Sequence, residues 1–415
     1  MQKKLLTMAV AGALAAPCIA LAQSSVEVYG TINLAFGKFK YTEGTAGEPS
    51  VSKWDVAQGA SNYGLRGREN LGGGLTAWFQ IEQNAPMERS NNVAITPASR
   101  NSAAGIQGAF GNVFLGQWTT PWADLDALWG VGNAGFWGPV TSIIGRRETT
   151  GTAPNPNCTN AGRSPAAGIC DAVEAAGGIG HAFWRRASQS IFYQSPVFSG
   201  VQIKWMYQTN EGKATGGGAG VTTADPSMYS ASAQWAGMGG RARVGVAFDR
   251  HKDFTTIGKS DTGYAIKGGW NFGVADVGLA YERMTYKAAA SDCRAKQYGV
   301  ALSVPVGPGA IKASYAVAKD IEGDYSGAGT CGATPTAASP SNDNGAKEYN
   351  IGYEHRFSKR TNIGIGYAAI KNDPAAVFTW TGAPPVQDGG LVRPANTPFP
   401  GSDPSTYFVS ITHRF

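Results

Sequence analysis

Charged side chains alternate with apolar ones in many short segments of this chain of 415 residues. Arg66 and Arg68 stand two residues apart, out of phase with Tyr63 and Leu65. Two residues is the side-chain repeat of a β-strand, so the guanidinium groups share one face and the apolar pair shares the other. A guanidinium stays charged at any working pH and binds carboxylate or phosphate groups. By the same alternation, the polar faces of other strands carry Gln80, Glu82, Lys204, Arg241, Arg243, Lys267, Lys312, Glu354 and Arg356.

Residues suited to catalysis or metal binding form no recognisable motif. The histidines have no partner at the spacing that nucleophilic catalysis needs, and no C-x-x-C pair suggests zinc. The glycine-rich stretch 215–220 lacks the Lys-Ser/Thr and the helix of a phosphate-binding loop. We therefore expect no enzyme, no cofactor and no metal site. The scattered histidines are His181, His251, His355 and His413.

The elements that position these side chains are predicted to be strands. Apolar residues recur at every second position in sixteen segments, whereas few segments repeat them at helical spacing. The segments are marked by residues 26–36, 63–65, 75–81, 98–108, 112–118, 191–193, 201–207, 226–237, 242–248, 264–270, 277–281, 298–304, 311–317, 349–357, 363–367 and 405–415.

The connections between these segments alternate strictly in length. Seven are short, such as 69–74 and 305–309, and the long ones between them include 210–224, 321–345 and 372–402. The strands of a soluble two-sheet sandwich also alternate apolar and polar residues. Nothing in such a fold, however, requires short and long connections to alternate. Short turns at one end, long loops at the other and an even strand number are typical of an outer-membrane barrel. The sequence thus predicts an all-β fold: a transmembrane antiparallel β-barrel of 16 strands.

The first residues have the pattern of an export signal. Lys3 and Lys4 precede an apolar run over 5–14, and the small-x-small pattern at 20–22 fits a signal-peptidase site. We expect residues 1–22 to be cleaved, and residues 23–415 to form a single barrel domain.

Charge and hydropathy exclude two other classes of protein. Without the signal the chain has 33 basic residues (35 minus Lys3 and Lys4) against 29 acidic ones, a net charge of about +4. This excess is too mild for a nucleic-acid partner. After the signal no run of 18 apolar residues could form a transmembrane helix.

The last segment has one apolar face that ends in Phe415. Tyr407, Val409, Ile411 and Phe415 share that face, and Thr412 is on the other. A sheet can span hydrocarbon only when it closes on itself, because no backbone group can stay unpaired there. The last strand is therefore expected to close the barrel against the first.

Several motifs give the chain a resemblance to a known family. They are SSVEVYGTIN near the mature start, SNYGLRGRENLGGGLTAWFQIE at 61–82, RNSAAGIQGAFGNVFLGQWTTPW at 100–122, RASQSIFYQSPVFSG at 186–200 and the closing THRF. In this order they resemble the general porins of β-proteobacteria, which are trimeric outer-membrane barrels of sixteen strands. The resemblance covers the mature chain and implies a homotrimer in the outer membrane, in contact with lipid and lipopolysaccharide after export through the periplasm.

The resemblance also implies a constriction of the pore. In such porins the third extracellular loop folds inward, and here that loop would be 119–182. Its early residues Trp122, Asp124 and Asp126 would then face a basic wall across the pore. The wall would comprise Arg66, Arg68, Arg100 and Arg186.

Four cysteines remain after the signal, and the periplasm permits disulfides. We expect Cys158 to pair with Cys170 inside the third loop, and Cys293 to pair with Cys331 across neighbouring loops. Two other pairings remain open.

The predicted function is a water-filled channel for passive diffusion of small hydrophilic solutes and ions. Arginines on one side and loop carboxylates on the other would create a transverse field that selects solutes by size and charge. The basic excess favours anions, although Gln117 occupies a position where the family commonly has arginine. Two alternatives remain: a substrate-selective channel for small organic anions, suggested by the aromatic-rich segment 118–137, and an adhesin-like barrel acting through its surface loops.

Overall fold

The computed structural model describes residues 25–87, 97–133, 137–138, 142–144, 183–209, 225–254, 258–288, 290–324, 343–380, 387–388, 391–392 and 398–415. Within these residues, strands account for most of the elements. In chain order the elements are β1 (Ser25–Tyr41), β2 (Val51–Gln58), β3 (Asn62–Gly72), β4 (Leu75–Asn84), β5 (Ser102–Gly108), β6 (Gly111–Thr119), α2 (Pro121–Asp124), η1 (Leu125–Leu128), β7 (Arg186–Gln194), β8 (Val201–Gln208), β9 (Ser227–Gly237), η3 (Met238–Gly240), β10 (Ala242–Lys252), β11 (Ser260–Asn271), β12 (Asp276–Lys287), β13 (Asp292–Val306), β14 (Gly309–Ala318), β15 (Ala346–Arg356), β16 (Thr361–Asn372), β17 (Gln387–Asp388), β18 (Leu391–Val392) and β19 (Pro404–Arg414). No helix among the described residues has the length and apolar character needed to cross a membrane.

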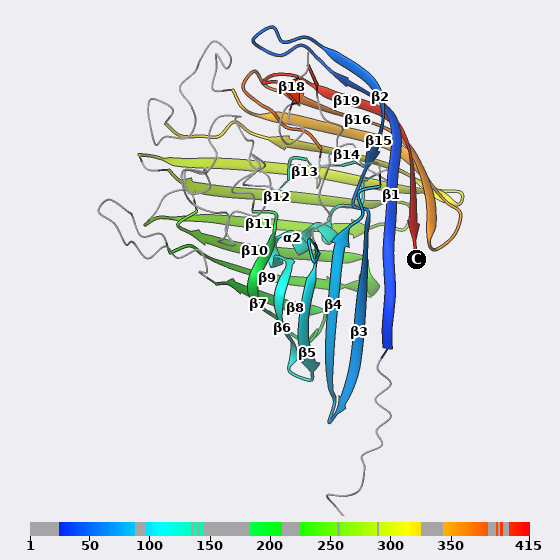
Figure 1. Cartoon of the computed structure of the whole chain (residues 1–415), viewed down its shortest axis with the longest axis vertical. Coiled ribbons are helices and arrows are strands. Elements are labelled where there is room, and N and C mark those ends of the chain that lie inside the picture. The colour runs from blue at the N-terminus through cyan, green and yellow to red at the C-terminus, as the bar shows by residue number, and fades with distance from the viewer. Residues whose placement is uncertain are drawn as a thin grey trace, which may run out of the picture.

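All the strands except β17 and β18, which pair with each other, form one closed antiparallel sheet (Figure 1). β19 pairs with β16 on one side and with β1 on the other, so the last strand joins the first. β1 pairs with β2 over residues 34–41 and with β3 over residues 25–31, so β2 and β3 are two parts of one barrel strand. The 17 strands of the sheet, less one for this division, give a barrel of 16 strands. The predicted fold class and the predicted closure are confirmed.

The predicted strand boundaries need two corrections. The second barrel strand begins at Val51, because Trp54 and Val56 continue its outward face beyond the interruption at 59–61. The fourth barrel strand begins at Ser102 and not at residue 98. The short turns lie where the sequence predicts them; the β3–β4 turn holds Gly72–Gly74 at positive φ, a conformation that suits glycine.

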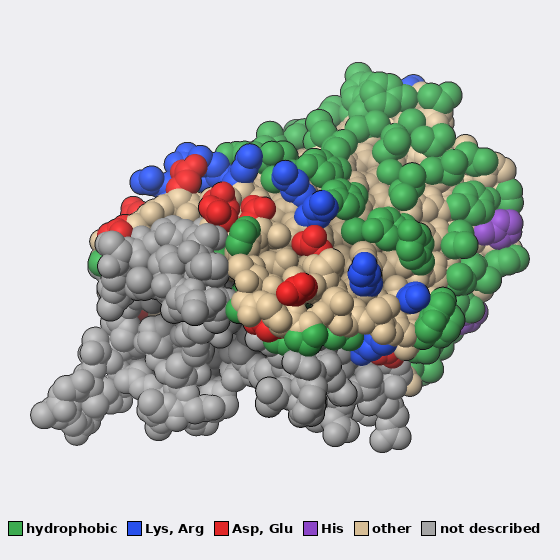
Figure 2. Space-filling view, turned by 90° about the horizontal axis from the view of Figure 1, so that it is seen from above, with side chains coloured by type: hydrophobic (Ala, Val, Ile, Leu, Met, Phe, Trp, Pro, Cys, Tyr) green, Lys and Arg blue, Asp and Glu red, His purple; other side chains and the backbone are tan. Residues whose placement is uncertain are grey.

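The outer face of the barrel is apolar. On β10, Val244, Val246 and Phe248 are 40%, 49% and 37% exposed, whereas Ala247 between them is 6% exposed. Figure 2 shows hydrophobic side chains over much of the top and right of the view, and charged side chains on its left and across its centre. A lipid-facing Arg or Lys would cost about 2 to 4 kcal/mol at the bilayer midplane, so this alternation identifies the outer face as the lipid face and the inner face as the lumen.

Candidate functional site

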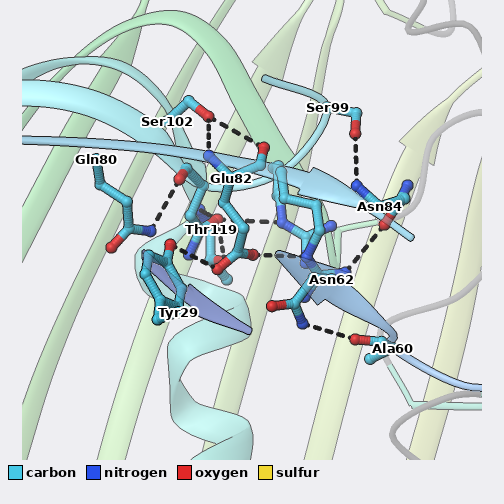
Figure 3. Close-up of polar contacts among 12 residues, drawn as sticks. Tyr29, Ala60, Asn62, Gln80, Glu82, Asn84, Ser99, Ser102 and Thr119 are labelled. Carbon is cyan, nitrogen blue, oxygen red and sulfur yellow. Dashed lines mark hydrogen bonds and ion pairs between the residues drawn. The ribbon is translucent and has the colours of Figure 1, made fainter. Parts of the chain in front are cut away.

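Two ion pairs on the lumenal faces of β1, β3 and β4 belong to one network, here called the arginine network. Arg66 forms a two-point pair with Glu27, with Nε–Oε2 and Nη2–Oε1 distances of 3.0 and 2.8 Å, and its guanidinium lies 4.8 Å from the Tyr29 ring centroid. The Tyr29 hydroxyl donates to Glu82 Oε2 at 3.0 Å (Figure 3). Arg100 Nε donates to Glu82 Oε1 at 2.6 Å. Contacts therefore run without a break from Arg66 to Arg100.

Arg186 lies close to this network through Asn101, the neighbour of Arg100 in the chain. Arg186 Nε donates to Asn101 Oδ1 at 3.1 Å. The same oxygen accepts from the backbone N and from Oγ1 of Thr119 at 3.0 and 2.9 Å. Gln117, at the position where the family commonly has arginine, donates to the Ser99 carbonyl at 3.0 Å. The structure thus brings three of the four sequence-predicted arginines to one region of the inner wall.

Arg68 differs from these three arginines. It faces the lumen from β3, opposite Trp78 of β4 in the strand register. Within the described residues it has no ion pair, whereas Arg66 and Arg100 are each neutralised by a carboxylate. Arg68 therefore contributes a positive charge to the lumen that no carboxylate of the described residues neutralises.

Sequence reasoning missed three members of this site. Glu27 and Tyr29 alternate with Val26 and Val28, so strand periodicity could have placed them on the lumenal face. Asn101 lies outside any strand, and its role depends on contacts with residues far away in the sequence. No pattern in the sequence indicates that role.

The segment after β6 begins with a short helix inside the barrel. Thr120 is the N-cap of α2, its side chain accepts from the Ala123 backbone N, and Pro121 occupies the first helical turn. Both residues suit these positions, because threonine satisfies an unpaired helical N–H and proline has none to leave unpaired.

Salt bridges fasten this segment to the barrel wall. Asp124 pairs with Lys204 of β8 at 3.0 Å, and Asp126 pairs with Lys267 of β11 at 2.6 Å. Lys267 also pairs with Glu282 of β12 at 2.7 Å, and both of these side chains are fully buried. Burial raises the pKa of the Asp124 carboxyl above its ordinary value, and Lys204 acts in the opposite direction. The two aspartates thus bind lysines of the wall on which they lie, rather than facing the arginines as bare carboxylates.

Two tryptophans complete the attachment. Trp122 and Trp129 are fully buried. Trp122 Nε1 donates to Glu282 Oε1 at 3.0 Å, and Trp129 Nε1 donates to Asp126 Oδ1 at 3.1 Å. A Cβ placed on Gly278 of β12 would lie 2.0 Å from the Trp129 carbonyl oxygen, so only glycine allows this close approach.

The described residues beyond η1 continue along the inner wall. Gly132 lies against β14, where a Cβ would stand 2.3 Å from the Ala313 carbonyl oxygen. The Trp137 carbonyl accepts from Asn350 of β15, and the Trp137 ring lies 5.3 Å from that of Phe39 on β1. The segment therefore follows the wall from β8 to β1. The wall formed by β3 to β7, near which the four predicted arginines lie, is on the other side.

Part of the last long connection also packs inside the barrel. The Trp380 ring lies 5.7 Å from the Trp137 ring, and Trp380 Nε1 donates to Glu348 Oε1 at 3.0 Å. Phe378 and Phe399 belong to the same buried cluster. The sequence shows this connection only as a long loop, so its inward packing is a finding of the structure.

Cys293 is disulfide-bonded. Cys158, Cys170 and Cys331 lie outside the described residues, as do residues 1–22 and most of 119–182. In the part of the chain that the structure describes, no group of three or more His, Cys, Asp or Glu side chains could hold a metal ion.

Comparison with known proteins identifies the family. The model of the Gram-negative porin family matches residues 7–375. The chain belongs to the Gram-negative porins. Among curated proteins, this porin is similar to outer membrane porin protein 32 of Delftia acidovorans, with 28% identity over 397 residues that cover 91% of this chain and 92% of the relative.

Solved structures share the fold of this porin. An anion-selective porin from Comamonas acidovorans matches with a TM-score of 0.64 and 23% identity, covering 94% of this chain and 100% of that chain. A complex of Salmonella typhi OmpF with daunomycin matches with a TM-score of 0.54 and 13% identity over 94% and 97% of the two chains. At these identities the likeness concerns the fold.

Family membership confirms three predictions. The protein is a porin of the outer membrane, crosses it with its barrel strands, and forms a channel for passive diffusion. Porins are channels, so the expectation that the chain is not an enzyme is also confirmed.

Proposed function

We propose that this porin prefers small anions, and that its passage is narrowest between the arginine-bearing wall of β3 to β7 and the segment on the opposite wall. Arg66, Arg68, Arg100 and Arg186 supply the basic side. Trp122, Asp124 and Asp126 hold the inward segment in place. The observation that supports this proposal is the gathering of these arginines on one lumenal surface, with Arg68 lacking an ion pair within the described residues.

Anion preference follows from the balance of charge at the two walls. On the segment's side Asp124 is matched by Lys204, and Asp126 shares Lys267 with Glu282, whose side chain is fully buried away from permeating ions. On the other side Glu27 and Glu82 match Arg66 and Arg100, which leaves the charge of Arg68 in excess. A positive lumen raises the local concentration of anions. The fold shared with an anion-selective porin agrees with this proposal.

The assembly and processing of the chain are part of the same proposal. Residues 1–22 act as a cleaved export signal, residues 23–415 form the barrel domain, and 119–182 is the constriction loop. The mature protein is a homotrimer whose outer surface contacts lipid and lipopolysaccharide.

The test is the reversal potential of the purified protein in a planar bilayer under a gradient of KCl. We expect the sign that corresponds to chloride permeating faster than potassium. A clear preference for potassium would overturn the proposed anion selectivity and leave the passive channel unaffected.

A further inference from the structure

Four aromatic rings gather on the lumenal faces of β4, β6 and β7; we call them the aromatic shelf. Its members are Trp78, Phe114, Trp118 and Phe192. Phe114 stacks on Phe192 with ring centroids 4.8 Å apart and an interplanar angle of 2°. Trp78 and Trp118 lie 5.3 and 5.4 Å from Phe114, and 5.8 Å from each other.

Strand alternation places the shelf on the lumen side. Phe79, next to Trp78, is 37% exposed on the lipid face, and Leu115, next to Phe114, is 62% exposed there. Phe114 and Phe192 are almost completely buried, whereas Trp78 and Trp118 are half-buried. The two tryptophans therefore present aromatic surface to a lumen that is polar in water-filled barrels.

Nothing in the described part of the inward segment accounts for this aromatic surface. The other buried members of its cluster are Ala187, Met206, Met228 and Phe254, all outside residues 121–144. Trp78 is held in place because its Nε1 donates to Asn112 Oδ1 at 2.8 Å. The described residues offer no hydrogen-bond partner to Nε1 of Trp118.

An arginine flanks the aromatic shelf. Arg68 stands opposite Trp78 in the strand register, and side chains in such positions have Cβ atoms about 4.5 to 5.5 Å apart. A planar ring on the shelf would thus have the Arg68 guanidinium at one edge.

We propose that the aromatic shelf, with Arg68, is a lumenal subsite for small aromatic carboxylates. The ring lies on Trp78 and Trp118, and the carboxylate binds the Arg68 guanidinium. This inference rests on the proposed function, since the ligand must first enter an anion-accepting channel. Aromatic pairing adds about two- to tenfold in affinity beyond the burial of apolar area. An aliphatic carboxylate of the same charge lacks that gain.

The test measures block of the KCl current through the purified protein in a planar bilayer by benzoate and by cyclohexanecarboxylate. These anions have the same charge and similar size, and only benzoate is aromatic. We expect the half-blocking concentration of benzoate to be about two- to tenfold lower. Replacing both tryptophans, Trp78→Ala with Trp118→Ala, should remove this difference, and Trp78→Phe with Trp118→Phe should retain it.

The control is Trp205→Ala, which removes a tryptophan from the lipid face of β8 and should leave the block unchanged. Arg68→Gln should weaken the block by both anions to the same degree. Equal block of the unmodified protein by the two anions would overturn the inference, and this result does not depend on whether the alanine variants fold. A preference for benzoate that persists in the double alanine variant would overturn it as well. The reversal potential of the same preparation under a KCl gradient tests the proposed anion preference separately, which distinguishes a failure of that proposal from a failure of this inference.

Discussion

Two ion pairs on opposite sides of the lumen lie in opposite environments. Lys267 and Glu282 beneath the inward segment are both 0% exposed. Arg66 and Glu27 on the arginine-bearing wall are 49% and 56% exposed. Water screens an exposed pair, whereas charges in a dry interior interact strongly with each other and with little else. Buried pairs therefore hold a segment in place, and exposed charges act on solutes that pass.

The largest expected effect comes from breaking the buried ion pairs of Lys267. Lys267→Met leaves the carboxylates of Asp126 and Glu282 without their shared cation, and loss of one partner from a buried pair costs about 3 to 5 kcal/mol. We expect a lower midpoint of unfolding in urea and a noisier channel current. The matched variant Arg66→Met breaks an exposed pair and should cost about 0 to 1 kcal/mol. Equal losses in the two variants would contradict the assignment of separate roles.

A smaller effect should follow from pushing the segment away from its wall while keeping every charge. Gly278→Ala places a methyl group against the Trp129 backbone, and overpacking of this kind costs about 1 to 3 kcal/mol. We expect a changed single-channel conductance in KCl, because the segment must shift into the lumen. Leu279→Ala, on the lipid face of the same strand, is the control. Conductance that responds to neither change would argue against close packing of the segment on β12.

The smallest expected effect concerns the arginine-bearing wall, where Arg66 is paired with Glu27 and Arg68 has no ion pair within the described residues. Arg68→Gln removes a charge that no carboxylate of the described residues matches, so the ratio of chloride to potassium permeability should fall. An electrostatic energy of about 1 kcal/mol in water bounds this fall at roughly fivefold. Arg66→Gln also removes one positive charge, and it leaves the nearby carboxylate of Glu27 unmatched. We therefore expect the ratio of chloride to potassium permeability, measured from reversal potentials, to fall at least as far in Arg66→Gln as in Arg68→Gln. A smaller fall in Arg66→Gln would mean that Glu27 does not face the permeating ions.

Much of the fold could be predicted from the sequence. The period of two along Tyr407, Val409 and Ile411 predicts a strand and also which of its faces meets lipid, because a one-residue error would place polar groups in hydrocarbon. The short turns were equally clear. β2 escaped prediction because the interruption at 59–61 separates it from the more regular β3.

Less of the candidate site could be predicted. Alternation places Arg66, Arg68 and Lys267 on the lumenal face, and the same rule would have found Glu27 and Tyr29. It cannot show which charges meet. Asp124 is 80 residues from Lys204 in the chain, and Asp126 is 141 residues from Lys267.

The sequence by itself determined that this chain is a closed barrel with an apolar outside and a charged inside, since both properties follow from local periodicity and from the rule that no backbone group stays unpaired in lipid. Only the tertiary structure decided which lumenal charges are neutralised, which wall the inward segment covers and where the four aromatic rings meet. Those outcomes depend on the register and curvature of strands that are far apart in the chain, and local periodicity contains no information about them.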